Sequence, residues 1–253
     1  MITVSNVNYC VSKKFKLSNI ELTISPGVHH LLGPNGAGKT SFLNLLSGLI
    51  SADSGEIFIN DVEATPLNLK HLSKVRAYLL QKQSAHFSLT VRAMLTITLS
   101  LTDQDIENLC LNSLIIKGLD LEPLLDRVIT GLSGGESQRA HLARVLLHCE
   151  LQDNPAACLL LDEPFTGLDV AHKLWLNQFL ASLGQKIAII ISHHELNLAL
   201  NLAQPCIIIN NGRIHSVLKD SRDIEITTLL DVFKLPKHSL VETNEGILQI
   251  IGI

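Results

Sequence analysis

The 253-residue sequence predicts an α/β fold: a parallel β-sheet core, an antiparallel sheet beside it, and a helical segment inserted into the core. Apolar runs at 157–161, 187–191 and 206–209 are separated by helical stretches. This alternation is typical of strands buried on both faces of a parallel sheet. Between about residues 88 and 149 the apolar spacing is helical instead, which predicts the insertion.

The N-terminal part predicts the antiparallel sheet. Residues 1–30 and 55–60 carry short β-type alternation, broken by the turn pairs Pro26-Gly27 and Ser54-Gly55. Inside the first stretch, residues 28–32 form an apolar run that predicts a buried strand, and residues 41–49 then have helical spacing.

The domain organisation follows from what the chain lacks. It contains no linker composition, low-complexity tract or internal repeat, so we expect one domain over residues 1–253. The helical subdomain would span about residues 86–150. The tail, residues 220–253, is too short for a separate regulatory domain of the usual size.

Composition excludes some classes of function. The net charge is −4 and the sequence pI is about 6.2, so no basic surface suggests nucleic-acid binding. Aromatic residues make up 4%, which also disfavours base-stacking platforms. The five cysteines are scattered without a C-x-x-C pair and are expected to be reduced thiols. We expect neither a signal peptide nor a membrane span, since no apolar run reaches roughly 18 residues.

A glycine-rich loop lies between the predicted strand at 28–32 and the helix at 41–49. It fills every position of the phosphate-binding pattern G-x-x-x-x-G-K-[ST] and is followed by Ser41; its residues are Gly33, Pro34, Asn35, Gly36, Ala37, Gly38, Lys39 and Thr40. Its backbone N–H groups would point into one concavity at the positive end of the helix. Lys39 would reach the β- and γ-phosphates, and the Thr40 hydroxyl would coordinate Mg²⁺. The alternative is a glycine-rich turn without a ligand, which the strand–loop–helix context disfavours.

Two adjacent acids end the predicted strand at 157–161. Ionised carboxylates at a buried strand end are costly unless positive charge meets them. A magnesium nucleotide would supply that charge, with Asp162 holding the ion through water and Glu163 orienting or deprotonating the attacking water. A solvated acid pair is the alternative, and the intact phosphate loop upstream makes it the weaker one.

A second glycine-rich segment begins an amphipathic helix. Its residues are Leu132, Ser133, Gly134, Gly135 and Glu136. Ser133 stands at the N-cap position, so a simple capped helix is one interpretation. Two glycines inside a helix cost roughly 1 kcal/mol each relative to alanine, however, and they favour a phosphate that approaches the backbone closely.

In chain order, the phosphate-binding loop, the segment at 132–136 and the acid pair at 162–163 resemble the ATP-binding subunits of ABC transporters, over essentially the whole chain. The resemblance implies a P-loop NTPase with a RecA-like core, the cofactors ATP and Mg²⁺, and a helical insertion that carries the family signature, residues 132–136. It also implies a second copy of the chain as partner. Two copies would enclose two ATP molecules head to tail, so that Ser133, Gly134 and Gly135 contact the ATP of the other copy.

The resemblance also assigns smaller elements. Gln81 corresponds to the Q-loop residue that senses Mg²⁺ and water, with Gln83 as the alternative. Asp169 corresponds to the D-loop that crosses the dimer. His194 corresponds to the switch histidine that contacts the γ-phosphate, with its neighbour His193 as the alternative.

Two further expectations concern aromatic and histidine residues. Tyr9 stands where the family often has an aromatic residue that stacks on adenine, although packing explains such a tyrosine equally well. The remaining nine histidines, including His29 and His30, are expected to be ordinary surface or boundary residues.

The resemblance points to importers whose permease is a separate chain. Finer features are most similar to the ATPases of vitamin B12 importers, and they are Arg76-Ala77-Tyr78-Leu79, Gln81-Lys82-Gln83, the spacer at 151–156 and Asn244-Glu245-Gly246. Ferric-siderophore and haem importers stay open as alternatives. So do a soluble cassette ATPase acting in translation or DNA repair, and a non-hydrolysing scaffold.

Such a chain would work at the cytoplasmic face of the bacterial inner membrane as a peripheral protein. It would contact transmembrane permease subunits through the segment at about 84–95, and a periplasmic substrate-binding protein only indirectly. No nucleic-acid partner is expected.

Overall fold

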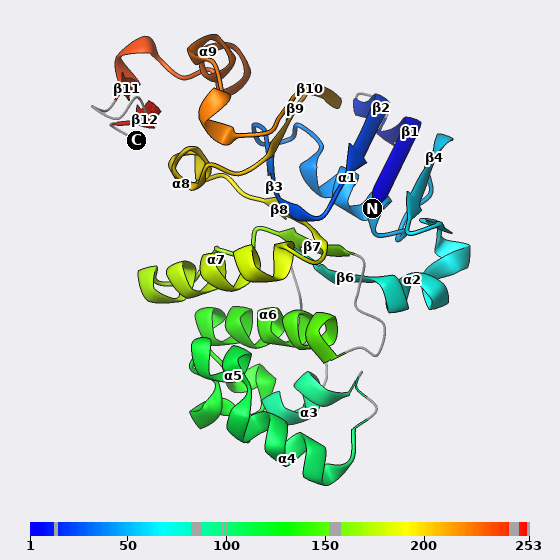
Figure 1. Ribbon diagram of the computed structural model, residues 1–253, viewed down its shortest axis with the longest axis vertical. Coiled ribbons are helices and arrows are strands. Elements are labelled where there is room, and N and C mark those ends of the chain that lie inside the picture. The colour runs from blue at the N-terminus through cyan, green and yellow to red at the C-terminus, as the bar shows by residue number, and fades with distance from the viewer. Residues whose placement is uncertain are drawn as a thin grey trace.

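The computed structural model describes residues 1–12, 15–81, 88–97, 99, 101–151, 158–242 and 248–251. These residues form two main β-sheets with helices between and around them, and the predicted α/β fold is confirmed (Figure 1). The sequence predicts a single domain with a helical subdomain that starts near residue 86. That starting point lies outside the described residues.

The central sheet has the strand order β10-β9-β3-β8-β7-β6. Its strands are β3 (Gly27–Leu32), β6 (Arg76–Leu79), β7 (Cys158–Asp162), β8 (Ala188–Ser192), β9 (Cys206–Asn210) and β10 (Arg213–Leu218). All neighbours pair in parallel except β9 and β10, which are antiparallel. The carboxyl ends of β3, β7 and β8 therefore lie next to one another at one edge, where ligands of open α/β sheets bind.

The apolar strands are buried on both faces, as predicted. In β7, Leu159 and Leu161 belong to one hydrophobic cluster while Cys158 and Leu160 belong to another. Successive side chains of a strand point to opposite faces, so a run without polar residues fills two cores at once. This is why β7 and β8 are fully buried along their length.

The predicted antiparallel sheet is formed by the N-terminal part of the chain. Its strand order is β2-β1-β4-β5, with β1 (Ile2–Ser12), β2 (Phe15–Ile24), β4 (Ser54–Ile59) and β5 (Val62–Glu63). Helix α1 (Lys39–Leu46) buries Phe42, Leu43, Leu45 and Leu46 in the cluster that this sheet shares with the central sheet. Helix α2 (Leu69–Val75) then leads into β6.

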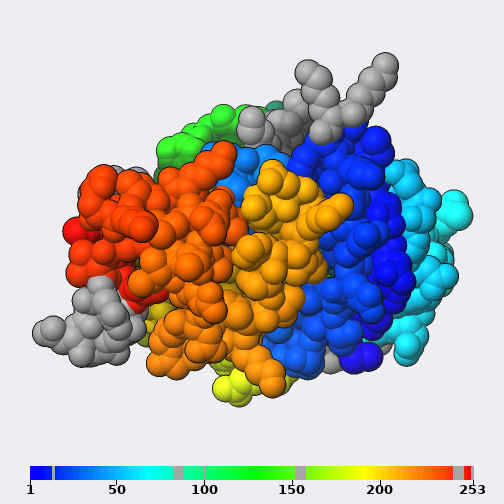
Figure 2. Space-filling model, turned by 90° about the horizontal axis from the view of Figure 1, so that it is seen from above, coloured from blue at the N-terminus to red at the C-terminus, as the bar shows by residue number. Residues whose placement is uncertain are grey.

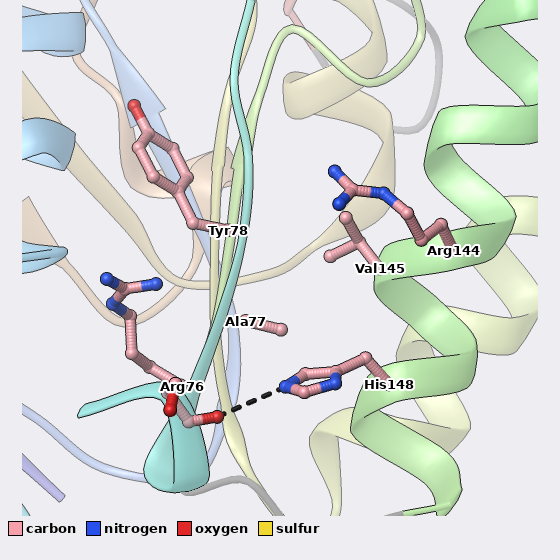
Figure 3. A pocket seen from close by; sticks show the side chains of 7 residues that line it. Arg76, Ala77, Tyr78, Arg144, Val145 and His148 are labelled. Atoms are coloured by element: carbon pink, nitrogen blue, oxygen red, sulfur yellow. Dashed lines mark hydrogen bonds between the residues drawn. The ribbon is translucent and has the colours of Figure 1, made fainter. Parts of the chain in front are cut away.

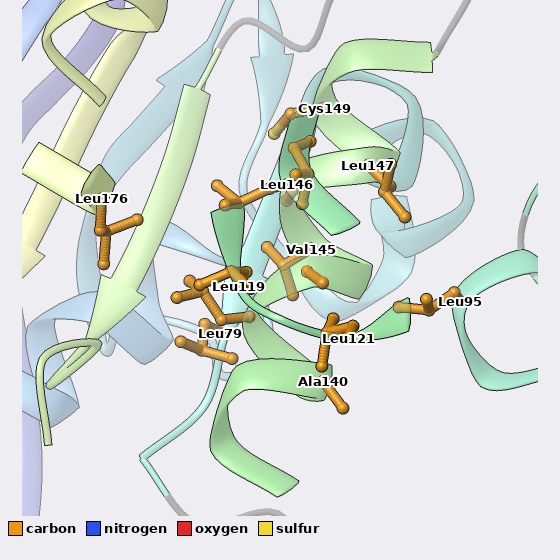
Figure 4. Packing of buried hydrophobic residues seen from close by; sticks show 14 of the residues in the cluster. Leu79, Leu95, Leu119, Leu121, Ala140, Val145, Leu146, Leu147, Cys149 and Leu176 are labelled. Carbon is orange, nitrogen blue, oxygen red and sulfur yellow. The ribbon is translucent and has the colours of Figure 1, made fainter. Parts of the chain in front are cut away.

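Helices cover the face of the central sheet that is opposite to α1 and the N-terminal sheet (Figure 1). Between β6 and β7 the chain forms α3 (Val91–Thr96), α4 (Asp103–Asn112), α5 (Leu114–Gly118) and α6 (Gly134–Leu151), and α7 (Val170–Gly184) follows β7. Helices α6 and α7 lie next to the sheet, and α3, α4 and α5 lie beyond α6 (Figure 1). Figure 4 shows Val145 and Leu146 of α6 facing Leu79 of β6 in the shared core.

The C-terminal segment packs beside β9 and β10. It contains α9 (Ile226–Phe233), β11 (Leu240–Glu242) and β12 (Leu248–Ile250), and it meets α8 (Leu196–Leu202), the helix between β8 and β9. In Figure 2 its orange and red surface lies on the side opposite to the cyan part of the N-terminal sheet. The side chain of Asn197, in α8, pairs with the backbone of Ile250 through two hydrogen bonds of 2.9 and 2.8 Å. The end of the described chain is thereby fixed to the helix that follows His194.

Candidate nucleotide-binding site

The glycine-rich loop joins β3 to α1, and its glycines are required by close contacts. A Cβ on Gly33 would lie 2.2 Å from the carbonyl oxygen of Ile209. Gly38 has φ of +111° at the N-cap of α1, and a Cβ there would lie 2.6 Å from Leu17. Only glycine fits both demands without strain. The loop is thus held against β9 on one side and the N-terminal sheet on the other.

Lys39 begins α1 and is nearly enclosed by the loop. Its Nζ donates hydrogen bonds to the carbonyl oxygens of Gly33 at 2.7 Å and Pro34 at 3.2 Å. Burial lowers the pKa of Lys39, whereas the neighbouring carboxylates of Glu163 and Asp162 act in the opposite direction. The ammonium is therefore held beside the concave side of the loop, where a phosphate would meet it.

A cavity of about 660 Å³ opens over this loop. Its lining brings together residues from several predicted motifs, namely Asn35, Gly36, Ala37, Gly38, Lys39, Thr40, Ser41, Gln81, Glu163 and His194, with Val11 and Phe15 added. Gly33 and Pro34 do not line it, and their carbonyls hold Lys39 instead. Gln83 lies outside the described residues, so the choice between it and Gln81 stays a prediction.

Asp162, at the end of β7, lies beneath the cavity and is 1% exposed. Its Oδ1 accepts a hydrogen bond from the Ser192 hydroxyl, and the Thr40 side chain also bonds to the carboxylate. Burial raises the pKa of Asp162, Glu163 raises it further, and Ser192, Thr40 and Lys39 oppose the rise. Its Oδ2 is buried and has no hydrogen-bond partner among the residues that the structure describes. A buried carboxylate oxygen without a partner, next to a hydroxyl, suits the oxygen ligands that Mg²⁺ prefers.

Glu163 has an unusual backbone. Its φ is +54°, a left-handed conformation that costs energy for a residue with a Cβ. Its N–H donates to the carbonyl oxygen of Ser192 at 3.0 Å and lies 3.2 Å from the Ser192 Oγ. This conformation turns the carboxylate into the cavity, where it contacts His194 Nε2.

The structure separates the two candidate switch histidines. His194 lines the cavity and contacts Glu163, whereas His193 is 3% exposed and packs inward. The expectation that the other histidines are surface or boundary residues is wrong for His30, His141 and His172, which are buried. His30 is completely buried in β3, and its ring hydrogen-bonds to His193 at 2.9 Å. A polar ring inside an apolar strand was missed because its partner lies 163 positions away in the sequence.

Among the described residues, the aromatic residue that lines the cavity is Phe15, and Tyr9 is not part of the lining. Tyr9 pairs with Leu17 between β1 and β2 and packs partly buried against the core. Phe15 starts β2, and its ring lies close to Gly38. The sequence signal for Phe15 is an aromatic residue on a strand that precedes the loop, but Tyr9 on β1 has the same signal.

The second glycine-rich segment lies at the start of α6, and none of its residues lines the cavity. The Ser133 N–H donates to Glu136 Oε2 at 2.8 Å, and the Glu136 N–H donates to Ser133 Oγ at 3.3 Å, which forms a capping box. Arg127 donates to the other Glu136 oxygen at 2.9 Å. Leu132 packs against the core.

The two glycines of this segment differ. A Cβ on Gly134 would meet nothing within 4 Å, whereas one on Gly135 would lie 3.1 Å from the Gly167 carbonyl. Asp169, two residues after Gly167, caps α7 by accepting the His172 N–H at 2.9 Å. The segment and the turn before Asp169 therefore lie side by side, and neither the segment nor Asp169 lines the cavity of the same chain.

A separate cavity lies between β6 and α6. Figure 3 shows Arg144 and His148 reaching from α6 toward β6, with His148 Nε2 3.1 Å from the Ser73 carbonyl oxygen. It is lined by Ser73, Arg76, Ala77, Tyr78, Arg144, Val145 and His148. It contains none of the predicted site residues.

A phosphate-binding loop, a buried carboxylate and a Glu–His pair around one cavity define the class of protein: a nucleotide-binding α/β protein with an arrangement suited to hydrolysis. A family model described as ABC transporter matches residues 17–166, which is more than half of the chain. The chain belongs to the ABC transporter family.

Three similar curated proteins are ATP-binding proteins of importers. The hemin import ATP-binding protein HmuV of Shewanella denitrificans is 40% identical over 220 residues, covering 85% of each chain. The vitamin B12 import ATP-binding protein BtuD of Citrobacter koseri is 38% identical over 208 residues, covering 81% of each chain. The petrobactin import ATP-binding protein YclP of Bacillus subtilis is 30% identical and covers 93% of each.

Solved structures agree with the fold. The ATP-binding subunit of an ABC transporter superimposes with a TM-score of 0.75 at 20% identity, covering 87% of this chain and 90% of that one. A dimeric ATP-binding cassette bound to ADP and phosphate gives 0.73 at 23% identity, covering 87% and 98%. None of the helices that the structure describes has the length and apolar character needed to cross a membrane.

Proposed function

We propose that this chain is the ATP-hydrolysing subunit of an ABC importer. The observation that carries the proposal is the contact between Glu163 and His194 at the cavity of the phosphate-binding loop. Two polar residues from different turns converge there on the space where a γ-phosphate would lie. The left-handed backbone of Glu163 supports it, since strained conformations of this kind are concentrated at functional sites.

In this proposal the loop residues 33–41 hold the phosphates through backbone N–H groups, and Lys39 turns from the loop carbonyls to the β- and γ-phosphates. Thr40, Asp162 and Gln81 would hold Mg²⁺, which when bound supplies positive charge beside the phosphate oxygens. The unpaired Asp162 Oδ2 supports that assignment. Phe15, rather than Tyr9, is our proposed contact for adenine because it lines the cavity.

Glu163 is the proposed general base. It would take a proton from the attacking water, while His194 would donate a hydrogen bond to the γ-phosphate and thereby leave its contact with Glu163. The negative charge that develops on the phosphate would be stabilised by Lys39 and by donors from a second copy of the chain.

The second copy would contribute residues 132–136, with Ser133, Gly134 and Gly135 against the γ-phosphate and Asp169 crossing the interface. The open space around Gly134 supports this, because none of the described residues of its own chain explains the absence of a side chain. A similar solved structure, an ATP-binding cassette bound to ADP and phosphate, is dimeric, which supports a second copy. Permease subunits and, indirectly, a periplasmic binding protein complete the proposed assembly, at the cytoplasmic face of the inner membrane.

Our first proposal for the cargo is vitamin B12, on the finer sequence features and the BtuD relative. A second candidate is hemin, which the 40% identity to HmuV favours. Nothing in the ATPase touches the cargo in this assembly, so cellular uptake must decide between them.

The test uses cells lacking this chain, rescued with the wild-type protein or with Glu163→Gln. Uptake of labelled cobalamin, hemin and a ferric siderophore would be measured side by side. Loss of cobalamin uptake alone, restored only by the wild type, supports the first proposal, whereas loss of hemin uptake alone supports the second. Unchanged uptake of all three would contradict the importer assignment for these cargoes.

A further inference from the structure

A hydrogen-bonded row of three polar side chains, two of them buried, ends next to His194. His30 Nε2 lies 2.8 Å from Gln204 Oε1, and His30 Nδ1 lies 2.9 Å from His193 Nε2. Both rings are buried, His30 completely and His193 to within 3%. Gln204 precedes β9, His30 lies in β3 and His193 follows β8. The row of side chains therefore spans three neighbouring strands of the central sheet.

Each ring is neutral, because burial lowers the pKa of His30 to about 4 and that of His193 well below its usual value. The charged or titratable neighbours His29, His194 and Lys39 act in the same direction, and only Gln204 and the Glu195 backbone oppose it. A neutral imidazole has one donor and one acceptor nitrogen.

The order of protons then follows from chemistry. An amide oxygen can only accept, so His30 Nε2 carries the proton and His30 Nδ1 is the acceptor. His193 Nε2 therefore donates to it. Gln204 thus determines, through two successive hydrogen bonds, which nitrogen of the His193 ring carries the proton.

The His193 ring is placed between the segments that make the site. It packs edge-on against His30 with centroids 5.0 Å apart, and against Phe165 with centroids 5.9 Å apart. His30 precedes the phosphate-binding loop by three residues, and Phe165 follows Glu163 by two. His194 is the next residue after His193. One ring is therefore in contact with the strand that leads to the loop, with the turn after Glu163 and with the backbone of His194.

We infer that Gln204, His30 and His193 are positioning residues, which fix the turn carrying His194 so that its ring meets Glu163. The inference rests on the proposed function, since it assigns these residues to the hydrolytic step. None of the three lines the nucleotide cavity. Their loss should therefore lower turnover without weakening the binding of ATP.

The experiment compares Gln204→Glu with Gln204→Leu. Glutamate keeps an acceptor oxygen for His30, while leucine has a similar size and no acceptor. Gln204 is partly exposed, so both variants are expected to fold. We expect Gln204→Glu to keep kcat within about twofold and Gln204→Leu to lose about tenfold, with KM for ATP unchanged in both, because small displacements of catalytic groups reduce turnover. His193→Phe, which keeps a ring of similar shape, should lose at least as much.

A spectroscopic readout separates positioning from a general structural effect. In ¹⁵N NMR of the wild-type protein, His30 and His193 should both be protonated at Nε2 and unprotonated at Nδ1. Gln204→Leu should disturb this order and Gln204→Glu should retain it. A protonated Nδ1 on either ring of the wild type, or full turnover in Gln204→Leu, would overturn the inference. Absence of ATP hydrolysis by the wild-type protein would instead reject the proposed function.

Discussion

Gly135 and Gly167 lie backbone against backbone: a Cβ on Gly135 would lie 3.1 Å from the Gly167 carbonyl oxygen, and one on Gly167 would lie 3.9 Å from the Gly135 Cα. The first turn of α6 is thereby held against the turn that leads into α7. Contact within the chain explains the glycine at 135. It does not explain Gly134, whose missing side chain leaves open space.

Replacing Gly134 by alanine separates folding from assembly. Alanine favours a helix by up to about 1 kcal/mol, so the free energy of unfolding should stay equal or rise slightly. ATP hydrolysis and ATP-dependent dimerisation should fall at least about tenfold, because a methyl group would stand where the phosphate of the second copy is proposed to lie. Thermal unfolding, size-exclusion chromatography with ATP and phosphate release are the measurements.

The matched control is Gly131→Ala. Gly131 also has open space around its Cβ position and precedes the same helix. It should keep both activities. Equal hydrolysis by the two alanine variants would show that Gly134 does not face a ligand.

Glu163→Gln should retain ATP binding but lose hydrolysis. The amide keeps the size of the side chain and cannot act as a base, so phosphate release should slow by roughly 10²–10⁴-fold. The dissociation constant of a fluorescent ATP analogue should change little. Glu21→Gln, an exposed substitution on β2, is the control and should behave as the wild type. Near-normal turnover by Glu163→Gln would mean that another group is the base.

Phe15 and Tyr9 can be compared by the same substitution. Phe15→Leu keeps apolar packing but removes the aromatic face at the cavity, so the affinity for ATP should fall about tenfold if the ring stacks on adenine. Tyr9→Leu should leave the affinity unchanged, because Tyr9 is not part of the lining. Titration with ATP at equilibrium measures both. A larger loss with Tyr9→Leu would restore the original prediction from the sequence.

Acid should destabilise the protein through His30. Its pKa in the folded chain is lowered from 6.5 to about 4, so the unfolded chain binds more protons between these values. The contribution of His30 to stability is therefore complete above pH 6.5 and is lost as the pH falls towards 4, by on the order of 3 kcal/mol. Urea unfolding across this range should show a smaller loss for His30→Gln than for the wild type. The exposed His71→Gln on α2 is the control, and it should follow the wild-type curve.

The parts of the site that the sequence predicted are those where ligand chemistry dictates a local pattern. The phosphate-binding loop and the acids after β7 need particular residue types at fixed spacing, and both are recognisable within eight positions. The fold class was predictable for a similar reason, since strands buried on both faces must be apolar throughout.

The parts that were missed depend on pairing between distant segments. His30 was misjudged because its environment is set by His193 and Gln204, which the sheet brings together across more than 160 positions. Phe15 and Tyr9 lie on the adjacent strands β2 and β1. The pairing of these strands contains three register shifts along its length, and alternation alone does not give that register. Ser192, which holds both Asp162 and the Glu163 backbone, looked like an ordinary residue after a strand.

The left-handed backbone of Glu163 has a consequence for the history of such chains. At φ of +54°, glycine, asparagine and aspartate are the residues that fit with the least strain. Folding stability alone thus favours replacing the glutamate, and selection for hydrolysis opposes it. A descendant freed from the need to hydrolyse ATP would be expected to drift to glycine or asparagine at this position. Glycine or asparagine at position 163 would then mark a lineage whose proteins no longer hydrolyse ATP.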